Sequence, residues 1–528
     1  MSYSRNEKFW IKNKRVLIQF FYLKKGKPYS VAFFYLDGFK RLRIAELEKT
    51  IEQWVFLGVG GVSRALLEVL KKERPDWLNK AKITLIEPTD IRESESVKQF
   101  GVFSSVAKGI YETIDQRCRW IQVMIDESNF RHLLESEVGP NAFIVNLSTR
   151  VGTIDILKLA EEKKALYIDT ALDWWNDPVT DFNHGYEDSL ALLELEMLKQ
   201  TRHIQTSMVY TYGMNPGIVS SMALVALEKI VQILDPSLTP LIELKQYHLV
   251  AERLGLTLIQ IAERDCQTLS RKMDPAVCYN TWSPTGFIDE AFDSCAYTLG
   301  SHEEWTLQTA DIKHREEVLQ VFFECPSIDI IATSYEPRQG LLHGRLIPHQ
   351  EAHTLARFLK NGDYWPTVYY CYEPSDAGKL LLEAARKDRN IPTRFIRSDE
   401  IDGGYDSIGC LMYFRRPEGL RTFWIGSIVE NKDSVSQEVN ATLTQVAGGC
   451  FAAISYLIEH PKMGVISPEM IDPHFALKKA SPYLGHVDFM EVTAEHQPSS
   501  DELKDLIVTP HKSLVNWSRI PSREMSAV

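Results

Sequence analysis

Residues 53–72 read QWVFLGVGGVSRALLEVLKK, an apolar run followed by a glycine-rich turn and an amphipathic segment. No polar residue interrupts residues 54–57, which predicts a fully buried strand. Gly58 and Gly60 let the backbone turn sharply and approach a pyrophosphate without a Cβ in the way. A helix that begins near Gly61 would point its free N–H groups at that phosphate. The stretch therefore has the pattern of a dinucleotide-binding fingerprint.

The turn departs from the G-x-G-x-x-G pattern at one position. Ser63 stands where the third glycine is expected, and serine permits close helix packing less readily than glycine does. The alternative interpretation is an ordinary strand, turn and helix in which the glycines serve packing alone. The strands that follow favour dinucleotide binding, and the turn residues predicted to contact the cofactor are Gly58, Gly60, Gly61 and Val62.

The second β-branched run, residues 83–86, ends at Glu87. An acidic residue at this place is expected to hydrogen-bond the adenosine ribose hydroxyls. Its charge would repel a 2′-phosphate and so favours NAD, whereas Arg92 nearby leaves NADP open. We therefore predict NAD as the cofactor.

Length and composition narrow the possible classes of protein. A chain of 528 residues exceeds one compact core, so two or three domains are expected. The net charge of −12 argues against broad nucleic-acid affinity and suits a cationic substrate. The eight cysteines have neither C-x-x-C nor zinc spacing, and no segment reaches the ~18 uninterrupted apolar residues of a membrane helix. We expect a cytoplasmic protein with no metal, no membrane and no nucleic-acid partner.

Strand and helix patterns alternate through the first part of the chain, with strands expected at residues 54–57, 83–87, 120–125, 142–146 and 166–170. Such alternation predicts an α/β Rossmann fold with a doubly wound parallel sheet, whose ligands bind at the carboxyl ends of the strands. At these ends, Asn146, Ser148 and Thr170 are expected to line the nicotinamide side of the crevice. Asp173 is expected to face the substrate.

The pattern changes after residue 241. Polar and aromatic strands predict a second α+β domain with a largely antiparallel sheet, and we place them at residues 242–250, 367–372, 409–415 and 422–427. Between the two domains, Pro216 suits the first position of a helix that Asn215 would cap. A loop that lines the substrate is the alternative for this segment.

These patterns divide the chain into five regions: a basic N-terminal extension (1–50), an NAD-binding Rossmann domain (51–215), a substrate domain (216–435), a helical segment that packs back on the Rossmann domain (436–505) and a weakly ordered tail (506–528). The extension holds twelve Lys or Arg against four Asp or Glu and has no secretory signal pattern. Its residues 16–23 and 29–36 can form a hairpin.

Several motifs follow the glycine-rich turn in order: GMNPG at 213–217, AERD at 262–265, NTWS at 280–283 and PHQEA at 348–352. Together they resemble bacterial homospermidine synthase, of the saccharopine dehydrogenase-like group, from about residue 54 to about residue 485. The resemblance implies a homodimer that uses NAD to convert two putrescines into sym-homospermidine and ammonia, with spermidine as a further substrate to test. The residues around His349 differ from the usual Thr-His-Asn form of that family.

The resemblance also implies a site of Asn215, Glu263, Trp282, Glu290 and His349, with Asp376 as an additional substrate-binding candidate. Putrescine is a dication, and hydride can leave its carbon only when the attached amine is neutral. Two carboxylates in different surroundings can take that proton and anchor the far ammonium. We assign Glu290 to the reacting amine and Glu263 to the anchor, with an ion pair to Arg264 as the alternative for Glu263.

The remaining site residues have roles that follow from their chemistry. The ring face of Trp282 can stabilise an iminium carbon, although a core tryptophan is the alternative. His349 can relay protons, or it is an ordinary loop histidine. Asn215 can orient an amine or the nicotinamide carboxamide. His349 and His353 lack an evident third ligand, so we predict no metal.

In the expected reaction, hydride passes from putrescine to NAD, a second putrescine displaces ammonia from the imine, and the new imine takes the same hydride back. Water must be excluded, which predicts a closed tunnel between the domains. One alternative is a saccharopine- or carboxynorspermidine-type dehydrogenase, which would need Arg264, Arg338 or Arg345 to hold a carboxylate. The other is a non-catalytic NAD-binding protein, which would need neither Glu263 nor Glu290.

Overall fold

The structure is a computed structural model. It describes residues 50–91, 118–175, 189–269, 274, 276–303 and 318–492, together with the strands at 7–10, 16–22, 28–35, 103–106, 110–113 and 312–315. The predicted tail at 506–528 and Arg92 lie outside the described residues. The chain divides into two compact units, Met1–Glu48 and Lys49–Val528.

The first unit contains a three-stranded antiparallel sheet of β1 (Glu7–Trp10), β2 (Val16–Tyr22) and β3 (Pro28–Tyr35). The antiparallel register of β2 and β3 runs from Val16 opposite Tyr35 to Tyr22 opposite Pro28. The predicted hairpin is therefore confirmed.

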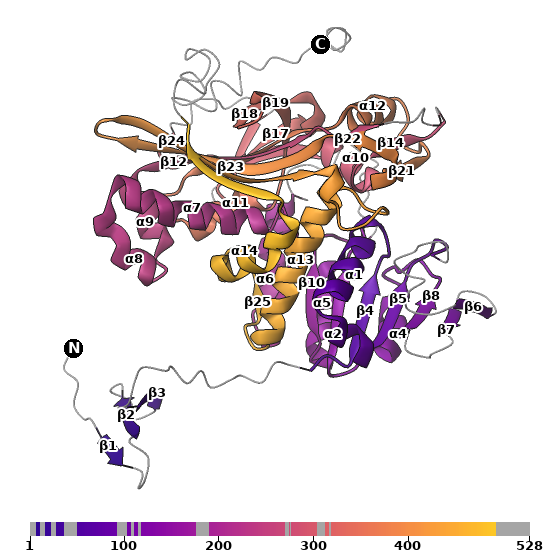
Figure 1. The fold of residues 1–528 in the computed structure, drawn as a ribbon, viewed down its shortest axis with the longest axis horizontal. Coiled ribbons are helices and arrows are strands. Elements are labelled where there is room, and N and C mark those ends of the chain that lie inside the picture. The colour runs from indigo at the N-terminus through magenta and orange to yellow at the C-terminus, as the bar shows by residue number, and fades with distance from the viewer. Residues whose placement is uncertain are drawn as a thin grey trace. The chain divides into compact units, whose positions relative to one another are not determined.

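The second unit begins with a nine-stranded sheet in the order β25-β11-β10-β9-β4-β5-β8-β7-β6. Figure 1 shows its part from β4 through β5 and β8 to β7 and β6. Neighbours from β25 to β8 pair in parallel, whereas β7 and β6 pair antiparallel. This arrangement confirms the predicted doubly wound Rossmann sheet. Its strands are β4 (Gln53–Leu57), β5 (Lys82–Ile86), β6 (Phe103–Val106), β7 (Ile110–Thr113), β8 (Cys118–Ile121), β9 (Ala142–Asn146), β10 (Leu166–Asp169), β11 (Met208–Val209) and β25 (Val465–Ile466).

Alternate residues of β4 enter two different cores, which explains why the strand is apolar throughout. Trp54 and Phe56 pack in the core that includes the helices on one face, α1 (Gly61–Glu73) and α13 (Ala441–Glu459). Val55 and Leu57 pack on the other face, in the core with α4 (Phe130–Glu137), α5 (Thr153–Lys163) and α6 (Leu190–Thr201). A strand buried on both faces needs no polar alternation.

A second, ten-stranded sheet follows, with β12 in its interior. Strand β12 pairs in parallel with β20 and antiparallel with β23, and the other pairs are antiparallel. The predicted largely antiparallel sheet is therefore confirmed. Its strands are β12 (Leu256–Asp265), β15 (Ser294–Thr298), β16 (Ile312–Arg315), β17 (Gln320–Pro326), β18 (Ile331–Glu336), β19 (Gly340–Ile347), β20 (Thr367–Glu373), β23 (Tyr405–Arg416), β24 (Gly419–Glu430) and β26 (His486–Glu491).

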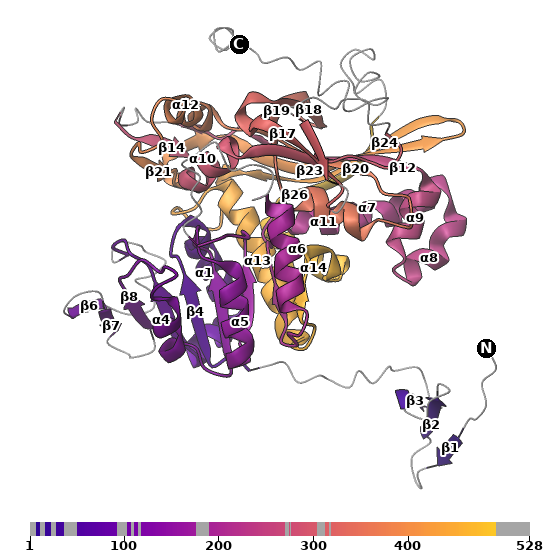
Figure 2. The same cartoon turned by 180° about the vertical axis from the view of Figure 1, so that it is seen from behind.

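The two faces of this sheet have different neighbours. One face shares a continuous core with the first sheet through α7 (Ile218–Leu234), α11 (Glu351–Phe358) and α13. Figures 1 and 2 both draw α7 and α11 along that side of the sheet, toward the first sheet. The hairpin of β18 and β19 contributes to the core on the opposite face. A residue's place on a strand therefore decides whether it faces the nucleotide-binding half.

Two sequence predictions about local structure are wrong. Residues 242–250, predicted as a strand, lie in α8 (Thr239–Glu243) and α9 (Tyr247–Leu254), where Tyr247, Val250, Ala251 and Leu254 bury one helical face. The true strand at this point is the neighbouring β12, which the sequence reading did not identify.

The helix after the GMNPG motif is the second correction. It is α7, which begins at Ile218 after Gly217, so Pro216 is not its first residue and Asn215 does not cap it. Gly217 has φ +128°, and a Cβ there would come within 2.3 Å of the Gly213 carbonyl oxygen. The motif is therefore a tight loop whose Asn215 side chain is free for another contact.

The chain returns to the first sheet through α13 and β25 before β26 rejoins the second sheet beside β24. Helix α13 packs against α1 and against α14 (Pro473–Ala480), and β25 then pairs with β11. Among the described residues, α13 alone has the length and hydropathy of a membrane span, but 94% of that window is buried inside the protein. Its apolar surface is already covered by neighbouring elements.

Candidate active site

The three glycines before and at the start of α1 have different surroundings. Gly58 has φ +81°, and a Cβ on it would meet Ser148 Oγ at 2.7 Å. A Cβ on Gly61 would meet Leu443 Cδ1 of α13 at 2.7 Å, whereas a Cβ on Gly60 would meet nothing within 4 Å. Within the described part of the chain, no side chain caps the N-terminus of α1. The free N–H groups and the open space at Gly60 fit a bound pyrophosphate.

Ser63 replaces the third glycine without opening the turn. Its side chain is buried, and Oγ donates a hydrogen bond to the Gly58 carbonyl oxygen at 2.6 Å. The hydroxyl therefore ties the first turn of α1 to the glycine-rich loop. Val62, the other predicted residue of this turn, packs partly buried against the core.

Glu87 lies beside the same loop, just beyond the carboxyl end of β5. Its Oε2 accepts from the Val59 N–H at 2.8 Å, and its Oε1 accepts from Thr89. A carboxylate at this place suits a ribose diol and opposes a 2′-phosphate. Glu87 therefore lies where a ribose-binding acid is required.

The predicted nicotinamide side is built from the ends of β9 and β10. Asn146 Nδ2 donates to the Tyr167 hydroxyl at 3.1 Å, and Asn146 Oδ1 accepts from the Ser148 backbone N–H at 3.3 Å. The Thr170 methyl lies 3.7 Å from where a Cβ on Gly213 would be. The Asp173 carboxylate accepts from the Arg150 N–H at 2.9 Å. Asp173 therefore holds the loop after β9.

That loop also reaches the second half of the site. The Arg150 guanidinium pairs with Asp289 at 3.0 Å, and Asp289 lies on α10 (Pro284–Phe292) directly before Glu290. The helix that carries Glu290 is thus tied to the nucleotide-binding half.

Glu263 is the centre of the buried polar site. It lies on β12 with 4% of its surface exposed, and both its donors use the same oxygen, Oε2: Asn215 Nδ2 at 2.9 Å and the Tyr370 hydroxyl at 2.7 Å. Burial raises the pKa of Glu263 to about 7, and the negative charge of Asp265 adds to this effect. Hydrogen bonds from Tyr370 and Asn215 and the charge of His349 oppose the rise.

Two further buried carboxyl groups lie next to Glu263. Asp265 on β12 and Asp406 on β23 are cross-strand partners. Thr281 Oγ1 donates to Asp265 at 2.5 Å, and Thr442 Oγ1, in the first turn of α13, donates to Asp406 at 2.6 Å. Burial raises the pKa of both groups, and Glu263 is a further cause for Asp406. Three buried carboxyl groups therefore lie together, and each holds a proton to higher pH than an exposed carboxyl does.

His349 lies between two carboxylates. Its Nδ1 is 3.0 Å from Glu351 Oε1, and its Nε2 is 3.5 Å from Glu290 Oε2. Its ring stacks on Tyr370 with centroids 3.9 Å apart. Burial alone would lower the pKa of His349, but Glu351 and Glu290 outweigh burial and raise the pKa to about 10. His349 is therefore an imidazolium at neutral pH.

Trp282 is joined to this centre by tyrosines. Its Nε1 donates to the Tyr372 hydroxyl at 3.0 Å, and its ring lies 5.3 Å from Phe287. Tyr372 in turn stacks with Tyr370 at 6.2 Å between centroids. An aromatic wall therefore runs from His349 through the two tyrosines to Trp282.

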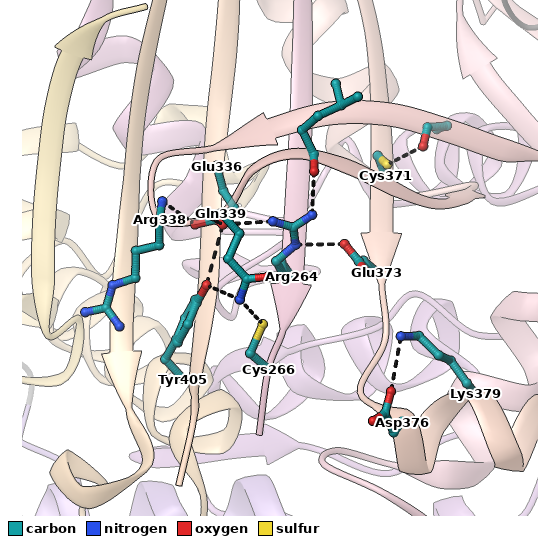
Figure 3. A network of polar contacts seen from close by, with 12 residues as sticks. Arg264, Cys266, Glu336, Arg338, Gln339, Cys371, Glu373, Asp376, Lys379 and Tyr405 are labelled. Carbon is teal, nitrogen blue, oxygen red and sulfur yellow. Dashed lines mark hydrogen bonds and ion pairs between the residues drawn. The ribbon is translucent and has the colours of Figure 1, made fainter. Parts of the chain in front are cut away.

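The structure thus brings together Asn215 with Glu263 and His349 with Glu290, and it links Trp282 to them. It does not bring Asp376 to this cluster: its side chain is 94% exposed at the start of α12 (Asp376–Ala385) and pairs with Lys379. Figure 3 shows that pair apart from the charged cluster around Arg264.

Four residues of the site were not among the predicted ones: Tyr370, Tyr372, Asp265 and Asp406. Tyr370 and Tyr372 are two residues apart on a predicted strand, so the sequence could have shown that they share a face. Asp265 follows Glu263 at the same period, but β12 was not predicted. Nothing local indicated that Asp406 would meet Asp265.

Arg264 is not a partner of Glu263, because consecutive strand residues point to opposite faces. Its guanidinium donates to Glu336 at 2.9 Å, to Glu373 at 2.7 Å and to the Leu341 carbonyl oxygen at 2.7 Å (Figure 3). The ion-pair alternative for Glu263 with Arg264 is therefore wrong.

The two other arginines considered for carboxylate binding differ from each other. Arg338 pairs with Glu430 and lies over the Tyr405 ring at 4.5 Å. Arg345 is opposite Tyr372 in the register of β19 and β20, where burial is the main cause that lowers its pKa. Among the described residues, no group of three or more His, Cys, Asp or Glu is placed to hold a metal ion.

A glycine-rich turn on a parallel sheet, together with a buried carboxylate close to an imidazolium, is the arrangement of an enzyme that binds a dinucleotide. Residues 54–210 match the Saccharopine dehydrogenase NADP binding domain.

Two relatives that the chain matches over most of their length are homospermidine synthases. The chain is 29% identical over 451 residues to that of Blastochloris viridis (82% of this chain, 90% of the relative). It is 28% identical over 456 residues to that of Mesorhizobium japonicum (82% and 89%). The crystal structure of the Legionella pneumophila homospermidine synthase in complex with NAD superimposes with a TM-score of 0.68 at 26% identity, over 84% of this chain and 93% of that one. The resemblance predicted from the motifs is confirmed.

Proposed function

We propose that this protein is a homospermidine synthase that uses NAD to convert two putrescines into sym-homospermidine and ammonia. The observation that carries the proposal is the buried Glu263, held by Asn215 and Tyr370 beside protonated His349. This arrangement occurs in a chain that is similar to homospermidine synthases over 82% of its length. A buried anion with a neighbouring proton donor suits a diamine that must be bound and exchanged.

NAD, when bound, supplies a reversible acceptor for the substrate hydride. The N-terminus of α1 and the open space at Gly60 would hold its pyrophosphate, and Glu87 its adenosine ribose. We assign Asn146, Ser148 and Thr170 to the nicotinamide side. A carboxylate at Glu87 favours NAD over NADP.

We assign the two ends of putrescine to two carboxylates. Glu263, in the buried centre, anchors the far ammonium, and Glu290 takes a proton from the reacting amine. The Glu290 side chain is 33% exposed and contacts His349, so a proton can pass between them. The carbon attached to the neutral amine can then release hydride, which leaves an imine.

The exchange step requires one bond to form and one to break. The neutral amine of the second putrescine adds to the imine carbon, and the original carbon–nitrogen bond then breaks. His349, protonated at neutral pH, donates a proton to the departing nitrogen, which leaves as ammonia. Glu290 then returns the proton it took from the first amine to His349 across their 3.5 Å contact, and the freed Glu290 carboxylate takes the proton released by the attacking amine. The new secondary imine recovers the hydride and becomes homospermidine.

Two features protect the imine. The Trp282 ring face can stabilise the positive charge that appears after hydride loss, an interaction worth roughly 0.5–2 kcal/mol. Burial of Tyr370, Tyr372 and Phe287 around it keeps that side of the site apolar. A closed tunnel between the halves remains a prediction.

The nearest competing function is a saccharopine- or carboxynorspermidine-type dehydrogenase, whose substrate carries a carboxylate. Arg264 and Arg338 are already paired with Glu336, Glu373 and Glu430. Only Arg345 lies on the strand face of Tyr372, which makes it the residue to test for that function. A non-catalytic NAD-binding protein would not require the buried Glu263.

Incubation with NAD and putrescine alone, followed by polyamine chromatography, tests the proposal. Homospermidine formed without net NADH is the expected result. Steady NADH release without a coupled polyamine would favour a dehydrogenase, and NAD binding without turnover would favour the non-catalytic protein. Parallel reactions with spermidine test the wider substrate range.

We further propose that the enzyme works as a homodimer in the cytoplasm and that residues 51–215, 216–435 and 436–505 act as cofactor domain, substrate domain and returning helical segment. The eight cysteines are all free thiols, which suits a reducing compartment. Light scattering of the purified chain tests the dimer.

A further inference from the structure

We propose that Tyr370 is a positioning residue of this reaction, because its hydroxyl holds Glu263 while its ring holds the His349 imidazole. The inference rests on the proposed function and extends it to a side chain to which the motifs assign no role. One buried residue would thus fix the cation anchor and the proton donor relative to each other.

The geometry supports a double contact. The hydroxyl donates to Glu263 Oε2 at 2.7 Å, and the ring stacks on the imidazole at 3.9 Å with the planes 21° apart. Tyr370 is 3% exposed, so neither contact competes with bulk water. The ring face of an aromatic group attracts a cation, which suits an imidazolium.

Tyr370 is held in place by two neighbouring strands and by a third contact, with Tyr372. Strand β20 lies between β12 and β19, where Tyr370 is in register with Ile261 and with Ile347. Its ring also stacks with Tyr372. Movement of Glu263 or His349 would therefore have to distort Tyr370 or lose a contact with it.

The two contacts have a predictable electrostatic consequence. A hydrogen bond to a carboxylate favours its ionised form, so the Tyr370 hydroxyl lowers the pKa of Glu263 against the effect of burial. Without the hydroxyl, Glu263 would take up a proton at higher pH. A neutral Glu263 cannot anchor an ammonium group by charge.

Other ionisable groups lie around Glu263 and His349, and a substitution of Tyr370 leaves them unchanged. Those that act on Glu263, Tyr370, Tyr372 or His349 are Asp265, Asp406, Glu290 and Glu351. A change confined to the Tyr370 hydroxyl therefore isolates its own effect.

Tyr370→Phe removes the hydroxyl and keeps the ring over His349. The matched control is Tyr369→Phe, because Tyr369 is the preceding buried residue, faces the opposite core, and donates to the Thr333 carbonyl oxygen at 2.9 Å. Both variants lose one buried tyrosine hydroxyl from the same strand.

In Tyr370→Phe, we expect the acidic limb of kcat/KM for putrescine to move up by roughly one pH unit. The KM at pH 7 should rise by roughly threefold or more and should recover at pH 9, where Glu263 is ionised again. Tyr369→Phe should keep the wild-type profile. An unshifted acidic limb in Tyr370→Phe, or an activity loss that is the same at every pH, would overturn the inference.

An infrared titration separates this inference from the proposed function. The carboxylic C=O band of Glu263, identified by its absence in Glu263→Gln, should titrate at higher pH in Tyr370→Phe than in wild type. A shifted band in a protein that makes no homospermidine would reject the function and retain the coupling. An unshifted band in an active synthase would reject the role of Tyr370.

Discussion

Asn215 Nδ2 donates to Glu263 Oε2 across 2.9 Å, and this contact joins the loop after β11 of the first sheet to β12 of the second. The tight loop between Gly213 and Gly217 holds the amide in place. An amide is a suitable partner, because it satisfies a buried carboxylate without neutralising its charge. Glu263 can therefore still attract a cation.

The burial of Glu263 should cost stability at alkaline pH. Its folded-state pKa is raised from 4.5 to about 7, so the folded protein binds the extra proton between these values and loses stability as the pH rises through them. At pH 8, Glu263→Gln should therefore be more stable than wild type by roughly 1–3 kcal/mol in unfolding free energy and should unfold at a higher temperature. This gain should disappear near pH 4. Calorimetry at both pH values checks this, and a gain that does not depend on pH would contradict it.

The proton on His349 should depend on Glu351. Because the folded-state pKa of His349 is raised to about 10, the imidazolium persists until the pH rises through that value. Glu351→Gln removes the main raising charge, so the alkaline limb of kcat should move down by roughly one unit or more. A pH series of turnover measures the shift, with His349→Gln expected to lack that limb. An unmoved limb in Glu351→Gln would exclude His349 as its origin.

Glu290 and Trp282 should act on turnover and not on cofactor binding. Glu290→Gln removes the group assigned to the reacting amine, and Trp282→Ala removes the ring next to Tyr372. We expect each to reduce kcat at least about tenfold, which is about 1.4 kcal/mol of the barrier. Steady-state rates and NAD titrations check this, with Glu135→Gln on the surface of α4 as the control. Wild-type turnover in both variants would refute the site assignment.

Gly60 and Gly61 should respond in opposite ways to alanine. A Cβ on Gly60 enters open space where the pyrophosphate is expected, so Gly60→Ala should keep its melting temperature and lose roughly tenfold or more in NAD affinity. A Cβ on Gly61 would lie 2.7 Å from Leu443 Cδ1, so Gly61→Ala should lose roughly 1–3 kcal/mol of stability. Calorimetric titration and thermal unfolding distinguish the two. Wild-type NAD affinity in Gly60→Ala would place the pyrophosphate elsewhere.

Glu194 should be a stability determinant that joins α6 to α11. It is fully buried on α6 and contacts His353 at 2.6 Å and Arg357 at 2.7 Å, both on α11. Glu194→Gln leaves those partners without their anion and should lower the free energy of unfolding by roughly 2–4 kcal/mol. The loss should be smaller than for a fully buried ion pair, because Arg357 is 37% exposed. Glu196→Gln, an exposed carboxylate on the same helix, should cost under about 0.5 kcal/mol.

The loss in Glu194→Gln should also depend on pH. Burial raises the pKa of Glu194, but His353 and Arg357 outweigh burial and lower it below its usual 4.5. The stabilisation is then fully present well above pH 4.5 and is lost gradually as the pH falls below that value, so the difference between wild type and variant should narrow steadily on acidification. Denaturant unfolding at pH 7, pH 4 and pH 3 measures this narrowing. Equal stabilities at pH 7 would show that the network contributes little.

Some of the fold and site was predictable because it depends on neighbours in the chain. The apolar run at β4, the glycines after it and Glu87 after β5 are local patterns, and they led to the Rossmann sheet and its ligand edge. The ordered motifs led to Asn215, Glu263, Trp282, Glu290 and His349. Residues 242–250 were predicted wrongly, because a short segment of mixed polarity has no decisive period and the apolar face of α9 resembles that of a strand.

The sequence by itself determined the nucleotide-binding turn, the two-sheet architecture and the residue types of the site. Only the tertiary structure decided that Tyr370, and not Tyr369, contacts Glu263, that Arg264 faces away from it, and that Asp406 meets Asp265. The reason is physical: strand periodicity alternates two faces but does not say which face is buried against which partner. That choice is made when segments distant in the chain pair into one sheet and share one core.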